Sequence, residues 1–203
     1  MDELELLKKD WKKNDGQFKQ VSEQEIYNML HKSSSSTVKW ILIVSILEFI
    51  LLNGLSLITN DDLSTKFAKL HPYLSVFEKV NYAIILSFIF VFYKNYKSIS
   101  VLDSSKTLLK QILKTRKIVN IYILWNIIIG SYFGIVSAID GFSNAYNNSK
   151  ATTIDFTPTK LVIIILITML IVIPFMWGFY RLLYGKLLNR LKKNLNDLKK
   201  IEY

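Results

Sequence analysis

Apolar residues along the chain gather into four long blocks, which cover residues 38–59, 74–96, 118–139 and 161–180. A helix needs about 20 apolar residues, at roughly 1.5 Å per residue, to cross the hydrocarbon core of a bilayer. A soluble domain of this length would not concentrate its apolar residues in such blocks. The pattern therefore predicts an all-α, polytopic membrane protein with four transmembrane helices, which we call spans one to four.

The polar segments around the spans differ in charge. From Lys94 to Lys117 seven cations accompany a single acid, Asp103, whereas the segments 60–73 and 140–160 carry few cations. Lys and Arg are enriched on the cytoplasmic side of membrane proteins, so both termini are expected inside the cell. The segments expected in the cytoplasm are residues 1–37, 97–117 and 181–203.

Composition narrows the possible chemistry. The chain has no cysteine and only two histidines, His31 and His71, which flank span one. Disulfides and thiolate metal sites are therefore excluded, and no cofactor or metal is expected. The net charge of +10 raises the possibility of nucleic-acid binding, but the basic residues collect beside the spans, which predicts a topological role instead. No known catalytic motif occurs, so we do not expect an enzyme.

Two of the spans should continue into the cytoplasm as helices. No Gly or Pro interrupts residues 104–129, which predicts one helix from about Ser104 to Ile139. Span four should kink at Pro174 and continue to about Lys200. Its leucines 187, 191, 195 and 198 have nearly heptad spacing and could pair with the face of Leu108 and Leu113 as a stalk.

Residues at the membrane interfaces complete the expected topology. Glu78 and Lys79 should lie near the outer headgroups, at the beginning of span two. The inner end of span four carries a dense group of aromatic residues, a pattern typical of an interfacial belt. The belt is expected to consist of Phe175, Trp177, Phe179, Tyr180 and Tyr184.

The amino-terminal segment is predicted to form two short amphipathic helices. Ser22 and Glu25 have the spacing of a capping box at the start of the second one, and Ser33–Ser36 would be a flexible joint or the cap of span one. Such helices either lie on the membrane surface or dock a cytoplasmic protein. The residues expected to anchor a partner are Leu4, Leu7, Trp11, Phe18, Ile26, Met29 and Leu30.

Glu48 is the most unusual residue, because it lies near the middle of span one. A charged side chain at that depth costs on the order of 2.5 kcal/mol or more, so it should face a partner, face water or be neutral. We expect an intramembrane polar layer of Glu48, Asn126 and Thr168. In it, a protonated Glu48 would bond Asn126 and fix how span one packs on span three. The alternative is a proton-linked or ion-linked site.

Small residues recur on one face of span three, at Gly130, Gly134 and Ala138. Such spacing lets two helix backbones approach closely. We expect this face to pack within the monomer, with a homodimer as the alternative.

The run from Trp11 to Asn14, the segment Ser22–Ser33 and the start of span one at Val38–Ile41 resemble a family of small four-span membrane proteins of Bacteroidota. The resemblance implies a bacterial inner membrane and a membrane-bound anti-sigma factor that sequesters a sigma factor of the extracytoplasmic-function group. Two alternatives to this regulatory role stay open: a small-solute or proton-linked transporter that uses Glu48, and a structural subunit of a larger envelope complex.

Overall fold

The computed structural model describes residues 22–58, 69, 71–99, 104–148 and 158–202. All secondary structure in these residues is helical. Each of the four helices is long and apolar enough to cross a membrane, which confirms the predicted all-α, four-span class. The helices are α2 (Glu23–Ile58), α4 (Pro72–Ile99), α5 (Ser105–Asn148) and α6 (Pro158–Glu202).

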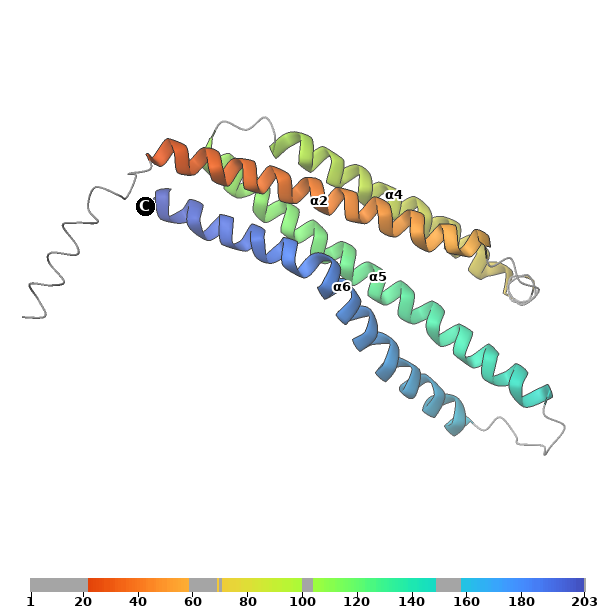
Figure 1. Ribbon diagram of the computed structural model, residues 1–203. Coiled ribbons are helices and arrows are strands. Elements are labelled where there is room, and N and C mark those ends of the chain that lie inside the picture. The colour runs from red at the N-terminus through yellow and green to blue at the C-terminus, as the bar shows by residue number, and fades with distance from the viewer. Residues whose placement is uncertain (1–21, 59–68, 70, 100–103, 149–157, 203) are drawn as a thin grey trace, which may run out of the picture.

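The helices form an antiparallel bundle in which α2 packs on α4 and α6, and α5 packs on the same two helices. The beginning of α2 and the end of α6 lie at the same end of the bundle (Figure 1). We call the half of the bundle at this end the terminal half and the other the far half. Contact between α2 and α5 is less extensive than contact between neighbouring helices, and the described residues of α4 and α6 are not in contact. Span one therefore contacts span three, as expected, but diagonally across the bundle, and it packs more extensively on spans two and four.

The hydrophobic core lies in the terminal half. Leu191, Leu195 and Leu198 of α6 are buried in one cluster with Leu108 and Ile112 of α5, so the two helices pair. Leu113, which is expected on the same face of α5, is 44% exposed instead. Helices α2 and α4 add their own apolar faces and complete a four-helix core. The remaining buried members of the cluster are Val38, Ile41, Phe92, Ile99, Val119, Tyr122, Tyr180 and Tyr184.

Helix α2 runs without a break through the serine tract 33–36. The side chains of Ser34 and Thr37 are fully buried, and the Asn194 amide donates hydrogen bonds to Ser33 Oγ (3.1 Å) and Ser34 Oγ (3.0 Å). The tract is therefore neither a joint nor the cap of span one. Small residues at this point let α6 approach α2 closely, and this packing outweighs the low helix propensity of serine.

The true start of α2 lies at the predicted capping box. The Ser22 N–H donates to Glu25 Oε2 and the Glu25 N–H donates to Ser22 Oγ, both at 3.2 Å. These bonds satisfy two backbone donors at the helix start. Residues 23–37 and span one are thus one helix of 36 residues.

Other helix boundaries also differ from the sequence-based expectations. Helix α5 continues past Ile139 through Asp140 and Gly141 to Asn148, so the loop expected over 140–160 is shorter. Helices α4 and α6 begin at Pro72 and Pro158, earlier than expected. Proline is favoured at the first position of a helix, where its missing N–H costs nothing.

Helix α6 continues to Glu202 as one helix that contains Pro174. It changes direction part-way along, so that its first part diverges from α2 (Figure 1). Proline within a helix removes a backbone hydrogen bond and clashes with the preceding turn, which is the usual cause of such a bend.

Close packing at Ser34 predicts that two substitutions in the same serine tract differ greatly in their effect on the stability of the bundle. Ser34→Leu should destabilise the bundle by about 1–3 kcal/mol, because the added volume separates α2 from α6. Ser36→Leu, at an exposed position two residues away, should change stability little. Unfolding of the purified protein in mixed detergent micelles, followed by circular dichroism, measures both. Equal effects would contradict the close approach of α2 and α6.

Candidate functional site

Glu48 lies at the centre of a buried polar cluster. Its side chain is only 6% exposed, and its carboxylate accepts hydrogen bonds from three tyrosine hydroxyls. Tyr180 donates to Oε1 at 2.5 Å, and Tyr122 and Tyr184 donate to Oε2 at 3.0 and 2.8 Å. The cluster therefore joins α2, α5 and α6 at one point.

This arrangement explains how a carboxyl group is accommodated inside the bundle. The two carboxyl oxygens of Glu48 accept hydrogen bonds from three hydroxyl donors. A buried polar group that is hydrogen-bonded in this way avoids most of the cost of leaving water. The described partners of Glu48 are thus hydroxyl groups on neighbouring helices, with no cation among them.

The three tyrosine rings pack on one another as well as on Glu48. Tyr180 and Tyr184, one helical turn apart on α6, are stacked with ring centroids 6.1 Å apart. Tyr122 meets both rings edge-on, at 6.5 and 5.9 Å. Phe88 and Phe92 of α4 pack edge-on against Tyr122 from the other side. The ring packing holds the three hydroxyls in position around the carboxylate.

The polar layer expected from the sequence differs in its members. Asn126 is buried near Glu48, but its amide donates to the Tyr122 backbone carbonyl at 2.8 Å instead of bonding Glu48. Thr168 is half-buried and donates to the carbonyl of Ile164 in its own helix, so it takes no part in the layer. Tyrosines had not been expected as the partners of Glu48.

The predicted aromatic belt at the end of span four is also divided. Phe175, Trp177 and Phe179 are exposed, as a belt requires. Tyr180 and Tyr184, in contrast, are buried on Glu48. Their burial could have been predicted from their spacing of four residues. This spacing places both tyrosines on the helix face that also carries Leu187 and Leu191.

The small-residue face of span three packs on α6. A Cβ atom on Gly130 would lie 2.7 Å from Met176 Cε, and one on Gly134 would lie 3.5 Å from Val172. Glycine at position 130 thus allows Met176 to approach α5. Ala138 continues the same face and is half-buried.

A cavity of about 260 Å³ lies beside Glu48 and is lined by all four helices. Its polar lining includes a second carboxylate, Glu78 of α4, whose Oε1 accepts a hydrogen bond from the Tyr82 hydroxyl. Glu78, which is expected near the outer headgroups, lies in the first part of α4 and borders the same cavity as Glu48. Asn53, Asn81 and Asn126 supply amide groups to the same cavity.

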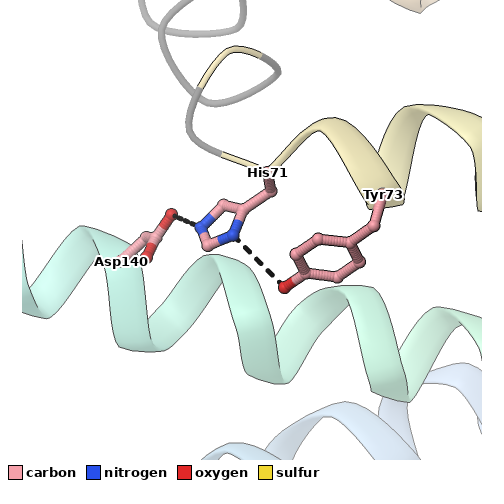
Figure 2. Close-up of polar contacts among 3 residues, drawn as sticks. All are labelled: His71, Tyr73 and Asp140. Atoms are coloured by element: carbon pink, nitrogen blue, oxygen red, sulfur yellow. Dashed lines mark hydrogen bonds and ion pairs between the residues drawn. The ribbon is translucent and has the colours of Figure 1, made fainter.

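A second polar contact fastens the far half. His71 Nε2 lies 2.6 Å from Asp140 Oδ2, and the Tyr73 hydroxyl lies 3.2 Å from His71 Nδ1 (Figure 2). The His71 and Asp140 side chains are less than one-fifth exposed. The contact holds the beginning of α4 against α5, near the end of the predicted span three.

Comparison with known families matches residues 24–203 to a domain of unknown function (DUF8845). The chain belongs to the DUF8845 family. No curated protein and no solved structure matches it. The match includes the polar cluster around Glu48 and the cavity beside it. Within the part of the DUF8845 protein that the structure describes, no three His, Cys, Asp or Glu side chains gather as metal ligands would.

Residues predicted to anchor a partner fall into two groups in this DUF8845 protein. Ile26 is half-buried, Leu30 packs against the core, and Met29 is 57% exposed. These three therefore do not form one free apolar face. The other predicted anchors, Leu4, Leu7, Trp11 and Phe18, lie outside the described residues.

The polar cluster of the DUF8845 protein predicts strong coupling between Glu48 and its tyrosines. Glu48→Ala should cost about 2–5 kcal/mol of folding free energy, because it leaves three buried hydroxyls without their acceptor. Tyr184→Phe should cost about 1 kcal/mol alone and much less in the Glu48→Ala background. Unfolding in detergent micelles measures each step of this cycle.

Thr168→Val is the matched control for that cycle, because Thr168 bonds only within its own helix. Its effect should stay within about 0.5 kcal/mol. Additive losses for Glu48→Ala and Tyr184→Phe would show that the two side chains do not depend on one another, contrary to the geometry.

Proposed function

We propose that this protein is a membrane-embedded regulator, and that the outer part of its terminal half is a cytoplasmic platform that holds a soluble protein partner. The observation that carries the proposal is that three of the four helices, α2, α5 and α6, continue as a packed core well beyond the apolar surface of the bundle. A protein that served only as an anchor or a pore would not need such an extension.

The length of the platform follows from the position of exposed apolar side chains. Large exposed apolar residues are dense on α2 from Trp40 onward, on α5 from Ile121 onward and on α6 up to Leu182. The helices continue for about 16 to 20 residues beyond these points, to Glu23, Ser105 and Glu202. At roughly 1.5 Å per residue the platform extends about 25–30 Å from the membrane.

The surface of this platform is strongly basic. Exposed acids on it are few, whereas exposed cations occur along α2, α5 and α6. The charge supports a cytoplasmic location and a partner with an acidic contact surface. The exposed cations are Lys32, Lys106, Lys110, Lys114, Lys117, Lys186, Arg190, Lys192, Lys193, Lys199 and Lys200.

The most concrete partner is a sigma factor of the extracytoplasmic-function group, and the support for this identity is the sequence resemblance described above. In this proposal the anchors Leu4, Leu7, Trp11 and Phe18 bind the partner, together with the exposed Met29. Leu30 contributes to the platform itself, since it packs on the core. The platform supplies the basic surface beside them.

The proposed orientation is testable because the natural chain has no cysteine. Single cysteines at Lys114, on the platform, and at Lys69, in the far half, report the two sides of the membrane. A membrane-impermeant maleimide added to intact spheroplasts should label Lys69→Cys, and should label Lys114→Cys only after permeabilisation. The reverse pattern would overturn the cytoplasmic location of the platform.

Partner binding is tested by affinity purification from native membranes, followed by binding of the purified candidate sigma factor. Deletion of residues 2–21 leaves all described helices in place and should weaken binding about tenfold or more. The pair Lys110→Glu and Lys114→Glu should weaken it as well, because it reverses charge on the platform.

Lys69→Glu is the control, since it reverses the charge of one lysine in the far half, away from the platform. Retention of full binding after the deletion would exclude the amino-terminal segment as the docking element. Copurification of integral membrane proteins alone would favour the structural-subunit alternative instead.

A further inference from the structure

The cavity beside Glu48 has the features of a ligand site. We propose that it binds a small organic ammonium ion, with Glu78 as the carboxylate that contacts the ligand. The inference does not depend on the regulatory function, because it stands on the lining of the cavity alone.

The electrostatic character of the cavity favours a cation. Two carboxylates, Glu48 and Glu78, border it, and none of its lining residues is Lys, Arg or His. Glu48 is already bonded by three hydroxyls, whereas Glu78 accepts one hydroxyl, on Oε1. The other oxygen of Glu78 accepts no hydrogen bond from the described residues. It is therefore the acceptor available to an ammonium group.

The other polar groups of the cavity add acceptors. Asn53 uses its amide N–H to bond the Phe49 carbonyl, and Asn126 uses its own to bond the Tyr122 carbonyl. Their amide oxygens are thus left for a donor in the cavity. Asn81 differs, because its oxygen already accepts from Trp125 Nε1 at 3.0 Å.

Aromatic rings and size distinguish an organic cation from a metal ion. Phe49, Tyr82, Tyr122, Phe133 and Tyr180 contribute to the walls, and ring faces attract ammonium groups. Mg²⁺ and Ca²⁺ instead prefer six or more oxygen ligands at short distance. The volume of about 260 Å³ lies just below that of pockets for drug-sized ligands, which fits a small amine.

The course of α6 explains why a cavity is present at this position. The cavity extends from Glu48 toward the far half of the bundle, because Leu52 and Asn53, which follow Glu48 along α2, also line it. Met176 and Tyr180 close it from α6, immediately after Pro174. Because the first part of α6 diverges from α2 (Figure 1), the packed core of the terminal half does not continue into this space.

Benzylammonium is a suitable probe, with benzyl alcohol and benzoate as neutral and anionic compounds of the same shape. Equilibrium dialysis of radiolabelled benzylamine against the full chain in maltoside micelles should give one saturable site per chain. The two other compounds should compete at least about tenfold more weakly. Empty micelles correct for partition into detergent.

Two variants locate the site. Glu78→Gln should weaken benzylammonium binding about tenfold or more while the protein stays folded by circular dichroism. Asn53→Leu should also weaken it, and it is the variant to use if Glu78→Gln does not fold, because Asn53 bonds only within its own helix. Asp197→Asn removes a carboxylate near the end of α6, away from the cavity, and should leave binding unchanged.

Several results would overturn the proposal. Absence of saturable binding would mean that the cavity holds water alone. Equal binding of benzyl alcohol would mean that the charge is not recognised. Unchanged affinity in both Glu78→Gln and Asn53→Leu would place the ligand elsewhere. Loss of the soluble partner has no bearing on these measurements, so failure of the regulatory proposal remains distinguishable.

Discussion

The three hydrogen bonds to Glu48 are the contact on which the bundle geometry depends. They connect α2 with Tyr122 of its diagonal neighbour α5 and with Tyr180 and Tyr184 of α6. Dispersion forces and apolar contact specify helix register weakly in a membrane, because lipid tails are as apolar as the side chains that face them. A buried carboxylate with three directed donors tolerates little sliding or rotation, since each displacement leaves a polar group unpaired. The cluster therefore sets the relative height of three helices.

Further polar contacts join neighbouring helices between the Glu48 cluster and the end of the bundle where α2 begins and α6 ends. Asn194 bonds the serines of α2, His31 Nε2 donates to the Ile99 carbonyl at 2.7 Å, and Gln111 donates to Asn95 Oδ1 at 3.0 Å. Each contact joins two adjacent helices within the apolar core. Among the described residues, fewer such contacts join the helices of the far half, and the contact between His71 and Asp140 is one of them (Figure 2). Polar contacts thus fix how the helices pack in the terminal half, whereas the described contacts fix the packing of the far half less strongly.

The sequence was sufficient for the class of fold, the capping box at Ser22 and Glu25, and the pairing of the leucines in α6 with α5, because each depends on spacing within one or two segments. It was insufficient for the partners of Glu48. Tyrosine next to a membrane interface is usually an interfacial anchor, and only the packing of α6 on α2 turns Tyr180 and Tyr184 inward. The serine tract was misinterpreted for a similar reason. Serine has a low propensity for the interior of an isolated helix. In this bundle, packing against the other helices outweighs that propensity along one buried face of α2. The buried residues of this face are Ser34, Thr37, Val38, Ile41, Ser45 and Glu48.

Glu48 lies where the two halves of the bundle meet. This position links the proposed partner platform of the terminal half to the proposed ammonium site in the cavity. The tyrosines that bond Glu48 belong to the buried cluster that continues into the platform, while Glu48, Tyr122 and Tyr180 also line the cavity. A cation bound at Glu78 would change the electrostatic surroundings of Glu48, because no lining residue carries a compensating positive charge. The hydroxyl groups that donate to Glu48 sit on α5 and α6, two of the helices that extend into the platform. Signals that begin in the membrane would therefore reach the platform through α5 and α6 as well as through α2, the helix that continues from the amino-terminal segment.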